Sequence, residues 1–453
     1  WPSSTAYQDT QTASNAPQAT DLSWREFFGD EKLRKLIETA LNSNRDLRLA
    51  ALNVERARAL YGIQKAELLP TLNANANAGK EHQADVYGFG RSLTLETYRV
   101  NLGVYAWELD FFGRLRNLKD RALEEYLATE QARRSAQILL ISSVANAYLV
   151  LAADREGLAL AQTTLATQQD AYNLVKRSYD LGLAPELDLY RAQTQVDTAR
   201  GDVARFIQLA AQDENALNLL LGDAAPGELL PARLSDVTSP REISPGVSSE
   251  ILLCRPDVLQ AESLLRAAHA DIGTARATLF PRISLTGTVG TASSELSGLF
   301  ESGSGTWSFA PQAAVPIFDT RAWLALGITK VQREIALTQY EKAIQNAFRE
   351  VADALAVRGT VDQQVSAQES LVHAVAETHR LSTIRYDTGI DSYLGVLDAQ
   401  RSLYAAQQGL VLLRLAKLAN QVRLYAVLGG GWQTEESPAS VAIFGPVPQR
   451  RRE

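Results

Sequence analysis

The chain has 453 residues, more than one ordinary hydrophobic core supports, so about two to four domains are expected, and its 46% hydrophobic and 21% charged residues exclude wholesale disorder. A formal net charge of −7 argues against a nucleic-acid partner, because neutralising phosphates requires a basic surface. The single cysteine, Cys254, excludes a disulfide framework and a thiolate metal cluster.

The chain begins at Trp1 and contains no methionine, so we expect that a leading segment such as a signal peptide was removed. Residues 1–23 are interpreted as an extended N-terminal segment. A first repeat then covers residues 24–222. It consists of a helix that stops at a proline, a β-hairpin over about 70–110 and a long helical hairpin over about 112–221.

The second part of the chain shows the same order of elements. A linker rich in Pro, Ser and Gly over 223–254 leads into a second repeat at 255–432. This repeat begins with a helix, followed by a β-hairpin over about 281–318 and a long helical hairpin over about 320–428. Residues 433–453 are expected to form a flexible C-terminal tail.

The two parts match each other as a tandem duplication does. Early in each repeat, matching residues are separated by a constant 211 positions, and later by a constant 207 positions. Examples of the matching pairs are Asp46 and Asp257, Gly62 and Gly273, Pro70 and Pro281, Gly182 and Gly389, and Leu221 and Leu428. A chance similarity would not keep its offset over so many positions.

After the proline in each repeat, the hydrophobic period changes to two, which predicts strands with one apolar and one polar face. The alternating apolar positions are Val100, Leu102, Val104 and Ala106 in the first repeat, and Ile283, Leu285, Gly287 and Val289 in the second. Aromatic residues that we expect in a membrane-interface girdle are Tyr98, Trp107, Trp307, Phe309 and Phe318.

Apolar residues recur every seven positions along 144–179 and again along 189–217, a spacing that predicts two long coiled-coil helices. A helix of about 65 residues would be about 100 Å long. No stretch offers eighteen uninterrupted apolar residues; the best, 138–153, is broken by serines and an asparagine. A membrane-spanning helix is therefore not expected.

Two hairpins supply four strands, which is too few to close a barrel, since the smallest closed barrels have about eight. An open sheet with an apolar face would leave edges and apolar surface unprotected. We therefore expect several copies to pool their strands; three copies give a transmembrane barrel of about twelve strands with a polar lumen. The predicted fold class is a mixed α+β membrane protein, a trimer whose barrel continues into a hollow α-helical barrel.

Several stretches of the sequence resemble the TolC family of outer-membrane efflux proteins, and within it the OprM-type drug-efflux channels. They span about Trp24 to Trp432, nearly the whole chain. The stretches are Asn44–Arg48, Trp107–Arg114, Arg255–Asp257, Phe280–Thr286, Gln345–Leu355, Leu397–Ser402 and Leu428–Trp432. The resemblance implies a homotrimer in the bacterial outer membrane that extends into the periplasm.

The same resemblance implies the partners of the chain. Family members dock on a periplasmic adaptor, also called a membrane fusion protein, and on an inner-membrane transporter of the RND type. Many OprM-type members carry a lipid on an N-terminal cysteine, so the resemblance also raises a lipid anchor ahead of Trp1. No cofactor is implied.

The two turns between the long helices are the strongest local candidates for function. Gly182 and Gly389 stand where each helix must stop, which predicts a left-handed cap residue. With Leu183 and Ile390 they are the expected adaptor contacts. Acidic residues crowd both turns, which predicts an acidic constriction at the closed end of the helical cylinder; they are Asp180, Glu186, Asp188, Asp387, Asp391 and Asp398.

By resemblance, Leu394 and Asp398 match an apolar and an acidic gate ring, and Tyr386 and Asp188 match a pair that holds TolC shut. The alternative interpretation is structural: Asp391 or Ser392 caps a helix, Asp398 pairs with Arg401, and the turns are simply solvated.

Nothing in the sequence supports an enzyme, because no nucleotide-binding, nucleophile-elbow or metalloprotease motif is present. His373 and His379 are six positions apart, a spacing that does not suit a metal pair on one helix face. The favoured function is a passive exit duct for drug-like compounds in a tripartite pump. Two alternatives remain open: the same architecture exporting proteins or metal ions, or a coiled-coil tether without a pore.

Overall fold

The computed structural model describes residues 17, 19, 22–83, 92–243 and 255–431. Most of the expected N-terminal segment, the hairpin loop at 87–90, Cys254 and the C-terminal tail lie outside the described residues. The chain divides into two compact units. The helical unit combines residues 1–51, 132–258 and 343–453, and the sheet unit combines residues 52–131 and 259–342.

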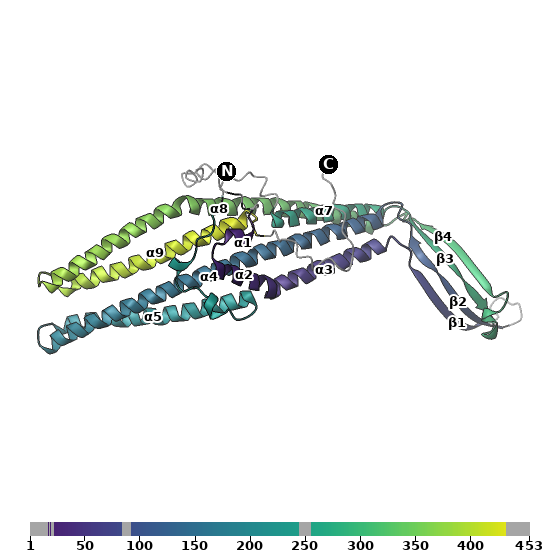
Figure 1. Ribbon diagram of the computed structural model, residues 1–453. Coiled ribbons are helices and arrows are strands. Elements are labelled where there is room, and N and C mark those ends of the chain that lie inside the picture. Colours follow the sequence, from purple (N-terminus) through teal and green to yellow (C-terminus); the bar gives the residue numbers. More distant parts are fainter. Residues whose placement is uncertain (1–16, 18, 20–21, 84–91, 244–254, 432–453) are drawn as a thin grey trace. The chain divides into compact units, whose positions relative to one another are not determined.

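Each repeat contributes one β-hairpin and one pair of very long helices (Figure 1). The α-helices are α1 (Trp24–Phe27), α2 (Glu31–Ser43), α3 (Arg45–Ala66), α4 (Arg114–Asp180), α5 (Glu186–Leu221), α7 (Pro256–Ala277), α8 (Thr320–Asp387) and α9 (Tyr393–Val427). The strands are β1 (Leu72–Gln83), β2 (Leu93–Glu108), β3 (Arg282–Ser293) and β4 (Gly305–Ala314), and the short 3₁₀ helices are η2 (Gly227–Leu229), η3 (Leu234–Asp236) and η4 (Ser297–Phe300). The predicted α+β class, with four strands and long helices, is confirmed.

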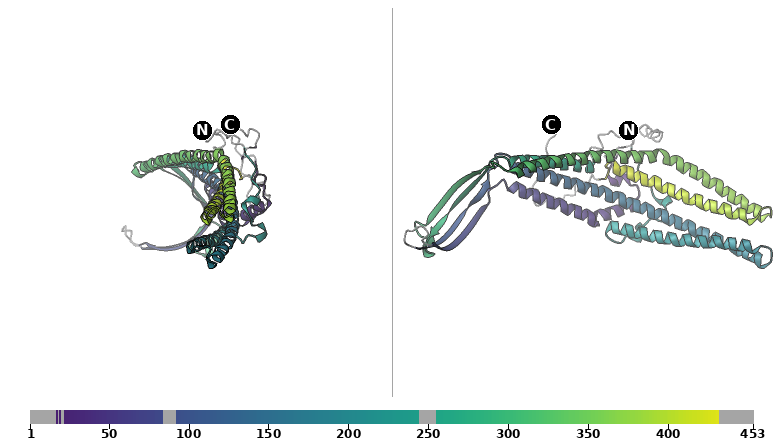
Figure 2. Two further views of the ribbon diagram at one scale, coloured as in Figure 1. Left: turned by 90° about the vertical axis from the view of Figure 1, so that its left-hand side faces the viewer. Right: turned by 180° about the vertical axis from the view of Figure 1, so that it is seen from behind.

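The four strands form one antiparallel sheet in the order β1-β2-β3-β4, drawn as a single curved layer in Figure 2. The pairing of β2 with β3 joins the hairpins of the two repeats, and β1 and β4 lie at the edges. Glycine permits close approach at this junction: a Cβ on Gly290 would lie 2.1 Å from the carbonyl oxygen of Val100.

The register of β2 and β3 shifts between Val104 and Trp107, where Ala106 adopts a φ of 50°. Because of this bulge, the predicted alternation of β2 is wrong at Ala106. Ala106 drops out of the apolar row, and Trp107 takes its place opposite Leu285. The extra residue reverses which side chains face each side beyond the bulge, as one inserted residue must when side chains alternate.

The hydrophobic core of the helical unit gathers around two tyrosines, Tyr148 and Tyr425, which are 1% and 2% exposed. The ring of Phe27 stacks on Tyr425 with centroids 4.0 Å apart, and the Tyr425 hydroxyl donates to the carbonyl of Leu22 at 2.8 Å. The short helix α1 is therefore fixed to α9, far away in sequence. Ser23 caps α1 through the amide of Glu26 in a reciprocal capping box.

The duplication is visible in matching long-range hydrogen bonds. In the first repeat the side-chain amide of Asn44 donates to the carbonyl of Leu220 at 2.9 Å. In the second repeat Arg255 donates from Nη1 to the carbonyl of Val427, also at 2.9 Å. Each bond fixes the start of a short helix to the last turn of a returning long helix, so the repeats share contacts as well as sequence.

Helix α4 contains a window with a mean hydropathy of 1.8 that is, by length and composition, long and apolar enough to cross a membrane. Of this window, 61% is buried within the protein, as in a core helix. The predicted heptad row is buried at Val144 and Leu151, half-buried from Leu158 to Tyr172 and exposed at Tyr179. There Ala161 and Val175 are the buried positions instead, because neighbouring helices decide which stripe is covered.

Candidate functional site: the polar sheet face and the helix tips

One face of the sheet is mainly apolar from edge to edge, with Thr291 and Ser293 of β3 as polar residues opposite Val100 and Tyr98. The register places the following residues on that face: Leu72, Ala74, Ala76, Ala78, Val100, Leu102, Val104, Trp107, Ile283, Leu285, Gly287, Val289, Trp307, Phe309, Pro311 and Ala313. Trp307 and Phe309 are 81% and 65% exposed, so the chain alone does not cover this face. Tyr98 belongs to the same row, next to Val100.

The apolar face ends where Lys80 and Glu96 form an ion pair across β1 and β2. From Leu72 to Lys80 the strand extends about 27 Å, taking about 3.4 Å per residue. Tilting the strand shortens this span to roughly the height of the apolar band of outer-membrane barrels. The dimensions of the sheet therefore suit a lipid bilayer.

The opposite face is lined by amides and hydroxyls. Its residues are Asn73, Asn75, Asn77, Arg99, Asn101, Ser284, Thr286, Thr288, Thr306, Ser308 and Gln312. Thr288 and Ser308 form a hydrogen bond of 2.7 Å across β3 and β4, and the Tyr105 hydroxyl donates to Asn101 at 2.8 Å. Such a surface is stable in contact with water.

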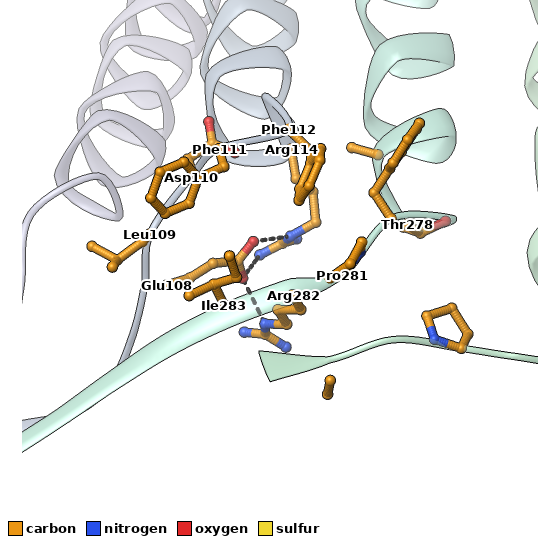
Figure 3. A pocket seen from close by; sticks show the side chains of 14 residues that line it. Glu108, Leu109, Asp110, Phe111, Phe112, Arg114, Thr278, Pro281, Arg282 and Ile283 are labelled. Atoms are coloured by element: carbon orange, nitrogen blue, oxygen red, sulfur yellow. Dashed lines mark hydrogen bonds and ion pairs between the residues drawn. The ribbon is translucent and has the colours of Figure 1, made fainter. Parts of the chain in front are cut away.

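A three-residue ion cluster lies at the end of β2 and the start of β3 (Figure 3). Arg114 donates from Nε and Nη2 to both carboxylate oxygens of Glu108 at 2.8 Å, and Nε of Arg282 lies 2.7 Å from the same carboxylate. The Glu108 side chain is only 9% exposed. The rings of Phe112 and Phe280 stack beside a cavity of 250 Å³ at this cluster.

The ion cluster connects two strands to the first residue of α4, so it fixes where the sheet ends and the helix begins. From the sequence, the segment that contains Glu108 and Arg114 was recognised as part of the family resemblance, but no role was predicted for either residue. The available signal was a charged pair six positions apart around Gly113, a glycine with a φ of 82°.

Both turns between long helices have the same backbone geometry. The amide of Leu183 donates to the carbonyl of Ser178, and that of Ile390 donates to Arg385, bonds of 2.8 and 2.9 Å that define Schellman motifs. Gly182 and Gly389 both have a φ of 74°, so the predicted left-handed caps are confirmed. The four expected adaptor contacts therefore lie in two equivalent, exposed turns.

The predicted gate residues lie on exposed parts of the second hairpin or beside the first turn. Leu394 is 51% exposed, and the Asp398 side chain is 64% exposed and bonded to Arg401 at 2.5 Å. This ion pair is the one that the alternative interpretation expects. In a single chain it is compatible with both interpretations, because an axial ring requires further copies.

The suggested latch residues have other neighbours in this structure. The ring of Tyr386 lies 5.0 Å from that of Tyr393, and Asp188 is 3.5 Å from Arg191 on its own helix. Asp391 pairs with Arg385 at 2.5 Å, and hydrogen bonding to that guanidinium lowers the pKa of the carboxyl. Asp188, Asp391 and Asp398 are thus each paired with an arginine of their own hairpin.

Two further polar groups, both in the helical unit, were not predicted from the sequence. Asp213 of α5 lies against Asp154 of α4, and burial together with the neighbouring carboxyl raises the pKa of Asp213 to about 6. On α9 the Tyr404 hydroxyl is buried beside Asp202 of α5. The hydrophobic periodicity of a helix gives no indication that residues so far apart in sequence are in contact. Among the residues described here, no group of three or more His, Cys, Asp or Glu could hold a metal ion.

An amphipathic sheet of bilayer dimensions, followed in each repeat by a long helical hairpin, is the architecture of a membrane channel subunit. Residues 36–223 and 247–430 match the family model described as outer membrane efflux protein. The chain therefore belongs to the outer membrane efflux protein family, and the predicted family is confirmed.

Among curated relatives, the toluene efflux pump outer membrane protein TtgC of Pseudomonas putida is 46% identical over 451 residues, covering 99% of this chain and 93% of that protein. The outer membrane protein OprJ of Pseudomonas aeruginosa is 41% identical over 421 residues, covering 92% and 88%.

Solved structures agree with this membership. A membrane protein from Pseudomonas aeruginosa has a TM-score of 0.88 at 41% identity, covering 91% of this chain and 93% of that one. The open state of the MtrE outer membrane channel of Neisseria gonorrhoeae has a TM-score of 0.85 at 38% identity, covering 94% and 95%.

Proposed function

We propose that this chain forms the outer-membrane exit duct of a tripartite efflux pump, acting as a passive conduit without catalytic activity. The observation that carries the proposal is the sheet with one apolar and one polar face, whose edge strands β1 and β4 each have an outer side with no partner strand among the described residues. Lipid would cover the apolar face, water would fill the space inside the polar face, and other copies would pair the edges.

A homotrimer satisfies all three requirements. Two copies would supply about eight strands, a barrel whose interior is filled by side chains, whereas three supply about twelve and leave a lumen. The edge strands β1 and β4 are antiparallel to their neighbours, and β4 of one copy can pair with β1 of the next around a closed ring. The long helices would continue this ring in the periplasm.

The partners follow from the tips of the helical hairpins. Leu181, Leu183 and Ile390 are 74%, 79% and 63% exposed, and they surround the turns capped by Gly182 and Gly389. Exposed apolar side chains on rigid turns are suited to binding another protein. We assign this surface to the periplasmic adaptor, which would connect the duct to an RND-type transporter in the inner membrane.

The substrates would be organic solvents and antibiotics. Relatives with similar coverage are named as a toluene efflux pump protein and as an antibiotic efflux pump protein, ArpC of Pseudomonas putida.

In this proposal Leu394 and Asp398 of three copies form the gate, with Tyr386 and Asp188 supporting it. A role in exporting metal ions is less favoured, since none of the described residues forms a metal-binding group.

Mass measurement in mild detergent and single-channel recording in planar bilayers test the proposal. We expect a trimer that conducts once the gate opens. A stable monomer or dimer would refute the barrel, and a trimer that never conducts, with or without its adaptor, would favour the coiled-coil tether.

A further inference from the structure

The cavity of 250 Å³ beside the Glu108 cluster lies entirely within the sheet unit. It is bounded by the end of β2, the start of α4, the end of α7 and the start of β3. An apolar cavity of about 150 Å³ is large enough to bind benzene. The cavity therefore has room for an aromatic ring together with a polar substituent.

The charged groups around this cavity leave one positive charge unbalanced. Arg114 and Arg282 share the carboxylate of Glu108. Asp110 accepts from the backbone amide and from Nε of Arg116, at 2.9 and 3.2 Å. Three guanidinium groups thus surround two carboxylates, and an occupant with one negative charge would balance them.

Arg282 is the arginine of this group with donors to spare. Its Nε lies 2.7 Å from Glu108, and its two terminal nitrogens have no partner among the described residues. Figure 3 shows Arg282 on the far side of the carboxylate from Arg114. On β3 it lies two positions before Ser284, and therefore on the same polar face. The free edge of a guanidinium can bind a carboxylate or sulfonate through two parallel hydrogen bonds.

Three phenylalanine rings supply the apolar part of the lining. The rings of Phe112 and Phe280 stack with centroids 5.0 Å apart and planes 14° apart. With Phe111, these residues line the cavity and are still 43%, 46% and 66% exposed, respectively. Half-exposed rings can pack against a further aromatic ring, in an offset or edge-to-face arrangement.

The duplication shows that the chain can pass from helix to strand without these side chains. At the offset of 211 positions, Phe280 and Arg282 correspond to Leu69 and Thr71 of the first repeat. There the chain connects α3 to β1 just as it connects α7 to β3 in the second repeat. The turn itself thus requires neither a ring nor a guanidinium, which leaves both groups available for binding.

We propose that this cavity binds small aromatic carboxylates and sulfonates. Arg282 pairs with the anionic group, and the rings of Phe112 and Phe280 contact the aromatic part of the ligand. The proposal rests on the proposed function for its meaning in transport: because Arg282 lies on the polar face, the cavity would open to the water inside the duct. Aromatic anions would be concentrated there, whereas neutral solvents would gain no ion pair.

Equilibrium binding of naphthoate to the full-length protein in mild detergent, followed by naphthoate fluorescence, tests the site. Naphthamide is the matched ligand, since it has the same rings without the negative charge. We expect naphthoate to bind about tenfold more tightly than naphthamide, the value of a hydrogen bond to a charged group. Equal affinities in the unmodified protein would overturn the proposal without any substitution.

Substitutions separate the anion contact from the ring contact. Arg282→Gln should abolish the preference for naphthoate over naphthamide, and Arg282→Lys should retain part of it. Phe280→Leu should weaken the binding of both ligands several-fold. Arg321→Gln is the matched control, because this arginine lies at the corresponding start of α8, pairs with Asp319 and is not among the residues that line the cavity. A preference for naphthoate that survives Arg282→Gln would overturn the assignment.

Two further measurements distinguish the site from a lipid contact and from the duct. In phosphatidylcholine nanodiscs, adding phosphatidylglycerol should leave naphthoate affinity unchanged; displacement by this anionic lipid would show that the cavity faces the bilayer and overturn the proposal. Conduction is recorded separately in planar bilayers. A protein that binds naphthoate but never conducts would overturn the duct and support the site, whereas a conducting protein that does not bind naphthoate would overturn the site alone.

Discussion

Replacing Glu108 by Gln should destabilise the sheet unit more than any other single charge change at its end. The side chain is 9% exposed and accepts from Arg114 at two oxygens and from Arg282 at one. A glutamine at this position would present an amide donor to two guanidinium groups. Removing one partner of a buried ion pair costs about 3–5 kcal/mol. Arg282 is 62% exposed and can be rehydrated, so we expect about 2–3 kcal/mol here.

The second repeat supplies a matched control. Asp319 pairs with Arg321 at the corresponding start of α8, but the Arg321 side chain is 92% exposed. Water can replace that pair, so Asp319→Asn should leave the stability of the sheet unit essentially unchanged. Glu108 is the last residue of β2 and Asp319 immediately precedes α8, so both lie where a strand leads into a long helix. They differ in burial, with side chains 9% and 31% exposed, and Glu108 has two arginine partners where Asp319 has Arg321.

The assay is thermal loss of strand signal by circular dichroism in mild detergent. For units of this size, about 1 kcal/mol shifts the midpoint by about 2–4 °C, so Glu108→Gln should lower it by about 4–12 °C. Equal shifts for the two variants would show that the Glu108 cluster contributes no more than an exposed pair. In that case the bulge and the Phe112–Phe280 stack would have to fix the junction.

Other predictions concern the gate, the buried acid pair and the tips. Asp398→Ala should reduce cation selectivity in bilayer recordings, whereas Leu394→Ala should raise conductance and leave selectivity unchanged. The pKa of Asp213 is raised to about 6 in the folded protein, so the folded state holds this proton more tightly than the unfolded chain does. Its contribution to the free energy of unfolding is complete below about pH 4 and is lost as pH rises through 6. Asp213→Asn should therefore flatten the thermal midpoint between pH 4 and 7, and an unchanged slope would contradict the pairing with Asp154. Gly389→Val should strain a residue with φ of 74° and weaken adaptor-dependent drug resistance in cells; full resistance would argue against docking at this turn.

Local patterns predicted the elements because each pattern has a local cause. Alternation over Ile283–Val289 reports which faces of a strand meet lipid or water, and the structure places these residues on one face. Gly182 and Gly389 were identifiable because only a residue without a side chain easily takes a left-handed cap. Four strands and two helical hairpins followed from such signals alone.

Contacts between distant segments were not predictable in the same way. The bulge at Ala106 depends on how β2 pairs with β3, so continuing the alternation gave the wrong face for one residue. The approach of Asp202 to Tyr404 depends on how two hairpins pack, which no heptad records. The Glu108 cluster joins residues from both repeats. Aligning the two repeats identifies equivalent positions but does not indicate which residues of one repeat contact the other. Sequence thus shows what each element is, while packing decides which polar groups meet.

The chemistry of the two units suits different parts of one task. Along the strands, the polar face offers amides and hydroxyls that water solvates well, and Arg99 adds one positive charge midway along β2. Such a lining gives an apolar solvent molecule no surface to bind, so it would neither select nor retain cargo. At the tips, by contrast, exposed apolar and acidic residues gather on rigid turns. The transporter would then discriminate between compounds, and the helical hairpins would control opening. The sheet would need only to keep an open, water-filled lumen and to remain stable in lipid.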